Sequence, residues 1–333
     1  MQSELQNRCD QLLENYDRMT IGNKFEYNSL IAAGAAMYAA AGTQVDTERL
    51  QECRKLLKTR KGIFSNYRGT AEFIVRCKLA MSNDPESYFE RLDTVYGELK
   101  NAFSSEQTLL AAIVITDFAE RGKESDAVEK TRTIYKEMSK AHPWLTSQDD
   151  MPFAALMAVV KKDAVSVYEE AESNYAILKE KLNATPGTRQ MLSHVLALYP
   201  GHSEIKCDRI CRLAAGLKAA KHPLSGDRYV AILGTLAASP LKEDDLIRMI
   251  ADADDYIKQH KGFHGLFGID RNVRRMLAVQ MVEAAQEESD ETGTMSGAAA
   301  VSTMISSSIE VAIITLLLMY TVIATTSAAS HHS

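Results

Sequence analysis

The 333-residue sequence is short of residues that break regular structure, since it contains only seven prolines and seventeen glycines. This scarcity argues against a loop-rich or disordered chain, and runs of alternating polar and apolar residues, the usual mark of strands, are also lacking. Apolar residues make up 46% and charged residues 25%, which is ordinary for a protein with a buried core. We therefore expect a folded, all-α protein.

No lysine or arginine follows Arg275, although six acidic residues do, and the net charge is −6. Subtracting these six from 44 acidic residues leaves 38, which matches the 38 basic residues, so residues 1–275 are neutral. A nucleic-acid-binding protein needs a basic surplus on some segment. Because the sequence has none, we expect no nucleic-acid partner.

The five cysteines are odd in number and widely scattered, and the polar N-terminus lacks the apolar core of a signal peptide. Both features favour free thiols and a cytoplasmic location. Cys207 and Cys211 lie one helical turn apart, but no two further ligands are suitably spaced, so we expect core packing rather than a metal site.

An internal period near 40 residues determines the expected architecture. Short apolar runs end in alanine at spacings of 39 to 41 residues, at Ala40, Ala80, Ala119, Ala158, Ala197, Ala237 and Ala278. A second landmark recurs at spacings of 39 to 42 residues, at Leu57, Leu99, Met138, Leu178, Leu217 and Ile257. About seven such units over residues 1–288 predict an α-solenoid of helix pairs, and a closed ring of helix pairs is the alternative.

Each unit reads as a charged amphipathic helix followed by a shorter, more apolar helix that is buried on most sides. PESYFERLDTVYGELK is an example of the first and TLLAAIVITDFA of the second. Asp84-Pro85 and Ser239-Pro240 have the pattern of a capping residue before a helix-starting proline. Ser104, three residues before Gln107, fits a capping box.

Four stretches, in this order, resemble a bacterial family known as domain of unknown function 4003. They are GIFSNYRGTAEF, HPWLTSQDDMPFAALMA, LSHVLAL and KGFHGLFGIDRNVRRMLA, and the resemblance covers roughly residues 1 to 285. It implies an all-helical bacterial protein, and it brings no activity and no functional residues with it.

The loops between the first and second helix of each unit are the candidate interaction sites. His142-Pro143 and His222-Pro223 are 80 residues apart, two periods, and such a repeated dipeptide is first of all a way to end one helix and turn into the next. Aromatic and histidine side chains in these loops are candidate binding anchors, namely Phe64, Tyr67, Trp144, Phe263, His264 and Phe267. The alternative is that they fold inward and fill the ends of the helix pairs.

No catalytic, cofactor or metal motif is present. His260 and His264 have ligand-like spacing near Asp252, Asp254 and Asp255, but Gly262 and Gly265 argue against a regular helix there. We interpret this group as solvated acids and loop histidines, and His194 as a core histidine whose polar atoms are satisfied, rather than as a base. The sequence favours a non-enzymatic interaction scaffold for a protein or peptide partner. The alternative is an enzyme that uses His142, His222 and His264 as acid–base groups.

The chain ends with an acidic, then Ser/Ala-rich segment (289–308) that reads as a linker, followed by a hydrophobic helix (309–330). Residues 311–330 carry no charge, and twenty helical residues span about 30 Å, the thickness of a bilayer core. We expect this helix to anchor the protein to the inner membrane. Packing onto the solenoid and self-association are the alternatives, because no basic residue flanks the segment.

Overall fold

The computed structural model of the protein describes residues 1–23, 26–63, 65–68, 71–100, 105–144, 146–159, 164–225, 229–265 and 268–291. Every secondary-structure element in these ranges is helical, which confirms the all-α prediction. In chain order the elements are α1 (Ser3–Gly22), α2 (Asn28–Ala40), α3 (Thr47–Arg60), η1 (Asn66–Arg68), α4 (Glu72–Met81), α5 (Pro85–Leu99), α6 (Glu106–Phe118), α7 (Glu124–Ala141), η2 (Gln148–Asp150), α8 (Met151–Val159), α9 (Ala164–Lys181), α10 (Pro186–Ala197), α11 (Ser203–Ala219), η3 (Val230–Ala238), α12 (Glu243–Lys258) and α13 (Arg271–Glu291).

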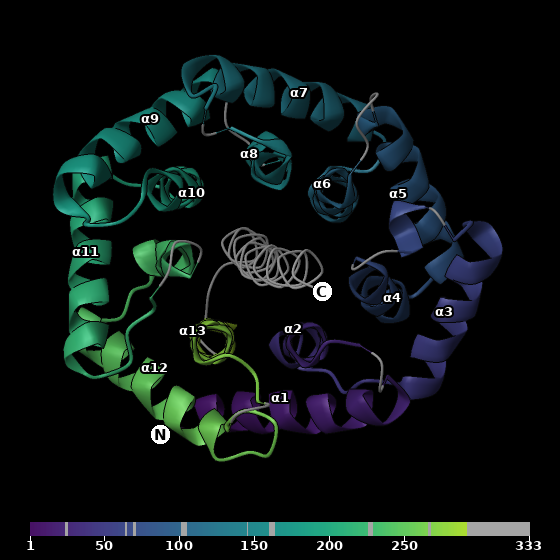
Figure 1. Ribbon diagram of the computed structural model, residues 1–333, viewed down its shortest axis with the longest axis horizontal. Helices are drawn as coiled ribbons and strands as arrows, with labels where there is room; N and C mark the ends of the chain where they lie inside the picture. The colour runs from purple at the N-terminus through teal and green to yellow at the C-terminus, as the bar shows by residue number, and fades with distance from the viewer. Residues whose placement is uncertain are drawn as a thin grey trace. The chain divides into compact units, whose positions relative to one another are not determined.

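Several successive helices in the described residues pack together as pairs. Helix α1 packs on α2, α5 on α6, α7 on α8, α9 on α10, and α12 on α13 (Figure 1). One expected second helix departs from the α form, because the nine residues of η3 after α11 form a 3-10 helix.

The chain divides into two compact units. The described part of unit 1 comprises residues 1–47 and 208–291, and unit 2 comprises residues 48–207. Unit 1 therefore combines the start of the chain with its last described helix, whereas unit 2 is continuous in sequence.

Within unit 1 the first helix pair packs against the last one, since α1 contacts α12 and α13, and α2 contacts α13. Tyr256 donates a hydrogen bond to Asp10 at 2.5 Å, and the ring of Tyr16 packs edge-on against Phe263 at 4.8 Å. An open solenoid contains no contact between its first and last repeats. The α-solenoid prediction is therefore not confirmed by the contacts within unit 1.

The second helices of unit 2 carry much of its core. Helix α6 is buried without interruption from Gln107 to Thr116, and α8 from Met151 to Ala158. Burial around the whole helix explains why these segments lack a polar stripe in the sequence. The expectation that second helices are buried on most sides is confirmed for both.

The predicted helix starts have mixed outcomes. Asp84 caps α5 by accepting a hydrogen bond from the backbone N–H of Ser87 at 3.0 Å, as predicted. Helix α6 is capped one residue later than predicted, by Ser105. The prediction that Ser239 caps the start of a helix is wrong, because Ser239 ends η3 and its hydroxyl donates a hydrogen bond to Gln286 at 2.6 Å.

Helix α13 reaches Glu291, so the helix extends into the segment predicted as a linker (289–308). The remainder of that linker and the predicted hydrophobic helix (309–330) lie outside the described residues. Among the residues that the structure does describe, no helix is both long and apolar enough to span a bilayer.

Candidate functional site

Two of the predicted anchors, Tyr67 and Phe263, are completely buried. Tyr67 packs against the rings of Phe89 and Tyr96, at 5.7 and 5.4 Å between centroids, and Phe263 packs on Tyr16. Their loops turn these rings back under the helices, where burial of a large aromatic surface stabilises the fold. The inward alternative therefore describes both residues, and neither is available on the surface as a binding anchor.

Trp144, by contrast, is 96% exposed, and His264 is exposed as well. Phe64 and Phe267 lie outside the described residues. A further exposed side chain in these loops is Ile63, at 74%, which the sequence argument did not single out because isoleucine is usually buried.

The recurrent histidines join successive helix pairs. His142 follows the end of α7, and its Nε2 lies 3.0 Å from both carboxylate oxygens of Glu172 on α9. His222 follows α11, and its Nδ1 lies 2.7 Å from Asp254 Oδ2 on α12. In both cases the partner is an acid 30 or 32 residues further on, in the first helix of the next pair. This shared contact gives a structural reason for the repeated His-Pro dipeptide.

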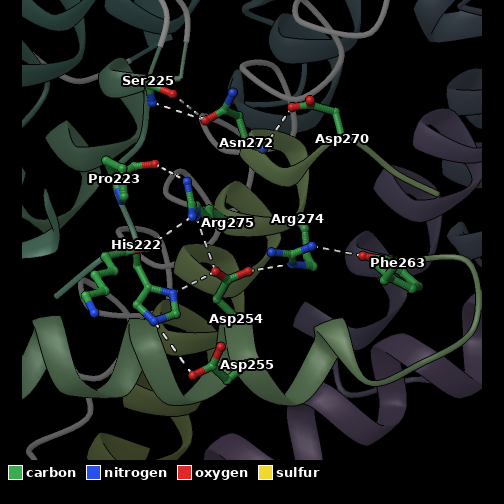
Figure 2. Close-up of polar contacts among 11 residues, drawn as sticks. His222, Pro223, Ser225, Asp254, Asp255, Phe263, Asp270, Asn272, Arg274 and Arg275 are labelled. Atoms are coloured by element: carbon green, nitrogen blue, oxygen red, sulfur yellow. Dashed lines mark hydrogen bonds and ion pairs between the residues drawn. The ribbon is translucent and has the colours of Figure 1, made fainter. Parts of the chain in front are cut away.

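Asp254 is the centre of a buried ion cluster in unit 1 (Figure 2). Its carboxylate, 1% exposed, accepts hydrogen bonds from Arg274 Nε at 2.6 Å and Arg275 Nε at 3.2 Å, besides the contact with His222. Asp255, the next residue, is 63% exposed, and its Oδ2 lies 3.7 Å from His222 Nε2 (Figure 2). The prediction of solvated acids is therefore wrong for Asp254.

The same two arginines hold the connections that lead into η3 and α13. Arg274 Nη1 donates to the carbonyl of Phe263 at 2.9 Å. Arg275 donates to the carbonyls of Pro223 and Lys221. Each guanidinium donates hydrogen bonds to a loop carbonyl as well as to Asp254, so the cluster anchors these loops.

The charge state of Asp254 follows from this geometry. Burial favours the neutral carboxyl and acts to raise its pKa. The hydrogen bonds from Arg274 and His222, together with the charges of Arg274 and Arg275, outweigh burial, so the pKa of Asp254 lies below its ordinary value. The carboxylate thus remains ionised and offsets part of the positive charge buried with it.

A second polar cluster lies in unit 2, around the connection between α7 and α8. Burial, and then the neighbouring Glu172 carboxylate, raise the pKa of Tyr168 to about 12. Glu172 therefore serves Tyr168 as well as His142. Such a carboxylate–histidine pair can orient an imidazole for proton transfer.

His194 on α10 adjoins this cluster and is 2% exposed, which confirms that it is a core histidine, but the prediction that its polar atoms are satisfied is wrong for Nδ1. Its Nδ1 is buried without a hydrogen-bond partner, and the nearest carboxylate oxygen, Asp150 Oδ1, is 4.0 Å away. Burial, and secondarily the charge of His142, lower the pKa of His194 to about 3. The folded protein therefore keeps this imidazole neutral.

The described part of the chain contains no group of three or more His, Cys, Asp or Glu side chains placed to hold a metal ion. Cys207 is buried, with its Sγ 3.8 Å from the carbonyl of Asn174. Cys211, one turn further along α11, is partly exposed.

The chain belongs to the family described as protein of unknown function (DUF4003), whose family model matches residues 15–316. This membership confirms the resemblance found in the four sequence stretches. The chain is also similar to the uncharacterized protein YeaA of Bacillus subtilis (strain 168), with 23% identity over 180 residues. That match covers 53% of this chain and 54% of YeaA, so the chain spans about half the length of this curated relative. No solved structure matches the chain.

Proposed function

We propose that this protein is a non-enzymatic interaction scaffold that binds a protein or peptide partner through the loops joining the first and second helices of unit 2. The observation that carries the proposal is the near-complete exposure of Trp144. Tryptophan is highly buried on average and is over-represented among residues that dominate binding energy. An indole ring left in water does not give the fold the stabilisation that its burial would.

Ile63 supports the same surface. It lies in the connection between α3 and α4, as Trp144 lies in the connection between α7 and α8, and each connection leads into the start of a second helix. Two second helices packed side by side are separated by about 8–10 Å. With one pair between them, the two side chains are on the order of 20 Å apart, which about six residues of an extended peptide can span.

The polar groups of the loops favour a scaffold over an enzyme. Each of the recurrent histidines, His142 and His222, is engaged with a carboxylate of the following helix pair, and Asp254 is enclosed by arginines that also hold loop carbonyls. These contacts give a complete structural use for residues that could otherwise serve chemistry.

Site-specific photocrosslinking tests the surface. A photoreactive amino acid replaces Ile63 or Trp144 in separate full-length variants expressed in the native host. Val165 and Ile205 are matched controls, because they are 56% and 64% exposed in unit 2 but lie in the first turns of α9 and α11, after the opposite connections. We expect the same crosslinked partner from positions 63 and 144 and none from the controls. Equal yields from all four positions would exclude a specific surface at these loops.

A second candidate function, an enzyme built from the loops, is favoured by one observation, the His142–Glu172 pair beside Tyr168. It predicts that His142→Ala abolishes a turnover while leaving the crosslinked partner unchanged. The scaffold predicts the reverse dependence, in which replacing Trp144 removes the partner.

From the sequence alone we further propose that residues 309–330 tether the scaffold to the inner membrane. Fractionation of the full-length protein against a chain ending at Ser308 separates the alternatives. Recovery in carbonate-resistant membranes that is lost on truncation supports the tether. A soluble oligomer that becomes monomeric on truncation indicates self-association, and unchanged soluble monomers indicate packing against the helices.

A further inference from the structure

A buried leucine followed by an exposed lysine recurs at the ends of three first helices of unit 2, α3, α5 and α9. Leu57, Leu99 and Leu178 are at most 2% exposed, whereas the lysine after each of them is exposed. We name these three residues the Leu-Lys lysines: Lys58, Lys100 and Lys179. Among the contacts of the described residues, none joins their side chains to a carboxylate or to a hydrogen-bond partner.

Acidic side chains near the ends of the first helices mostly have partners of their own. Glu137 pairs with Lys140 on α7 at 2.6 Å, and Asp93 on α5 contacts Lys61 at 2.5 Å. Glu180 on α9 is the exposed exception. The edge of unit 2 at which the first helices end therefore carries exposed ammonium groups that no carboxylate neutralises.

A cation at the end of a helix also stabilises the helix, because it faces the partial negative charge of the last carbonyls. That effect applies equally to the second helices, which end at the opposite edge. Yet the last turns of α6 and α8 contain no basic residue, and Lys78 at the end of α4 is paired with Asp117 at 2.7 Å. Helix stabilisation alone therefore does not explain why unpaired lysines recur at one edge.

The Leu-Lys lysines accompany the exposed apolar side chains of the proposed surface. Lys58 precedes Ile63 by five residues, and Arg60 between them is 43% exposed, with the nearest oxygen of Glu86 3.6 Å away. Each first helix of unit 2 ends where the chain turns towards a second helix, so these cations share an edge with Ile63 and Trp144. Cations beside apolar anchors are complementary to a peptide that carries both acidic and apolar side chains.

We propose that the partner bound at this edge is an acidic peptide segment, whose carboxylates contact the Leu-Lys lysines while its apolar side chains contact Ile63 and Trp144. This inference rests on the proposed function, because it names the chemistry of the partner that those loops bind. A nucleic acid or an anionic lipid surface fits less well. Residues 1–275 have no net positive charge, and Glu180 beside Lys179 would repel a continuous run of phosphates.

Binding of fluorescein-labelled poly-L-glutamate to the full-length protein tests the charge complementarity. Fluorescence anisotropy at pH 7.5 and low salt gives the dissociation constant. The test variant carries glutamine in place of all three Leu-Lys lysines. The control variant loses three other exposed cations of unit 2 to glutamine, two in the α6–α7 connection and one on α7, namely Arg121, Lys123 and Lys130.

We expect the test variant to bind poly-L-glutamate about tenfold more weakly, because each exposed ion pair contributes about a factor of two to binding. The control variant should stay within about twofold of the wild type. Arginine in place of the Leu-Lys lysines keeps their charge and should keep the binding. Added salt should weaken binding of the wild type more than that of the test variant, since the screened charges are already absent there.

The inference is overturned if the wild type does not bind poly-L-glutamate, or if the test and control variants lose equal affinity. Tighter binding of oligothymidine or of phosphatidylglycerol vesicles through the same lysines would also overturn it. Should the test variant fail to fold, the three single glutamine variants replace it, each with an expected loss of about twofold.

The photocrosslinking from positions 63 and 144 keeps the two proposals apart. A specific crosslink without lysine-dependent binding of poly-L-glutamate refutes the acidic partner and leaves the surface standing. Crosslinks of equal yield from all four positions refute the surface itself.

Discussion

Replacing Asp254 with asparagine removes the negative charge at the centre of the unit 1 cluster while keeping the size of the side chain. The change leaves Arg274 and Arg275, 7% and 8% exposed, without the carboxylate that both contact. Breaking a buried ion pair by removing one partner costs about 3–5 kcal/mol, because the remaining charge is buried without compensation. We expect Asp254→Asn to lower the free energy of unfolding of unit 1 by that amount.

The adjacent Asp255 provides the matched control. Its side chain is 63% exposed and 3.7 Å from His222, so Asp255→Asn should cost about 0–1 kcal/mol. Urea denaturation followed by far-UV circular dichroism measures both variants, since the only tryptophan lies in unit 2. If the two asparagine variants unfold at the same urea concentration, the cluster does not anchor the loops as the contacts imply.

The pH dependence of the same cluster gives an independent check. The pKa of Asp254 is lowered in the folded protein, so its stabilising contribution is fully present above the ordinary aspartate pKa, about 3.9, and is lost as the pH falls below it. The wild-type protein should lose this contribution on acidification below about pH 4. Asp254→Asn should lack that component of the acid transition.

Two further pairs of substitutions test the packing of the loops. Tyr67→Ala should reduce the free energy of unfolding by about 3–5 kcal/mol because the ring is buried, whereas Trp144→Ala should change it by less than about 0.5 kcal/mol. If thermal denaturation does not show Tyr67→Ala to be the less stable variant, the placement of these rings is wrong. Gly262→Ala and Gly265→Ala both place a side chain at a positive φ, 100° and 84°, at a cost of about 1–2 kcal/mol. Gly262→Ala should lower the stability more, since its Cβ would lie 3.0 Å from the hydroxyl of Tyr16, whereas a Cβ at Gly265 meets open space. Equal midpoints of thermal unfolding for the two variants would show that Tyr16 moves aside at little cost.

The helices were predictable because their signals are local and repeated. The stretch PESYFERLDTVYGELK combines a capping Asp84, a proline at the first helical position and an apolar stripe, and it forms α5 as predicted. Ser239-Pro240 carries the same dipeptide signal without starting a helix. There the serine hydroxyl bonds Gln286, 47 residues away, and a window around Ser239 contains no trace of that contact.

The polar clusters around Asp254 and His142 could not be predicted for the same reason, because their contacts join residues far apart in the sequence. Asp254 lies between Asp252 and Asp255 in the sequence, an acidic stretch that reads as exposed, and its burial depends on Arg274 and Arg275, one helix later. One signal was available, since His142 and His222 recur in register and each finds an acid 30 or 32 residues further on. Reading that spacing as a contact between successive helix pairs would have located both carboxylates. The burial of Tyr67 and Phe263 had no such signal, because an aromatic residue in a loop suits a surface anchor and a core plug equally.

Binding of the crosslinked partner to the wild-type protein and to Trp144→Ala, with thermal unfolding recorded on the same samples at pH 7.5, tests the interaction surface most directly. Truncating a dominant anchor at an interface lowers the binding free energy by about 2 kcal/mol or more, which corresponds to a dissociation constant at least about 30-fold larger. We predict that loss together with an unchanged unfolding midpoint. An unchanged dissociation constant for Trp144→Ala would contradict the proposal that these loops bind the partner.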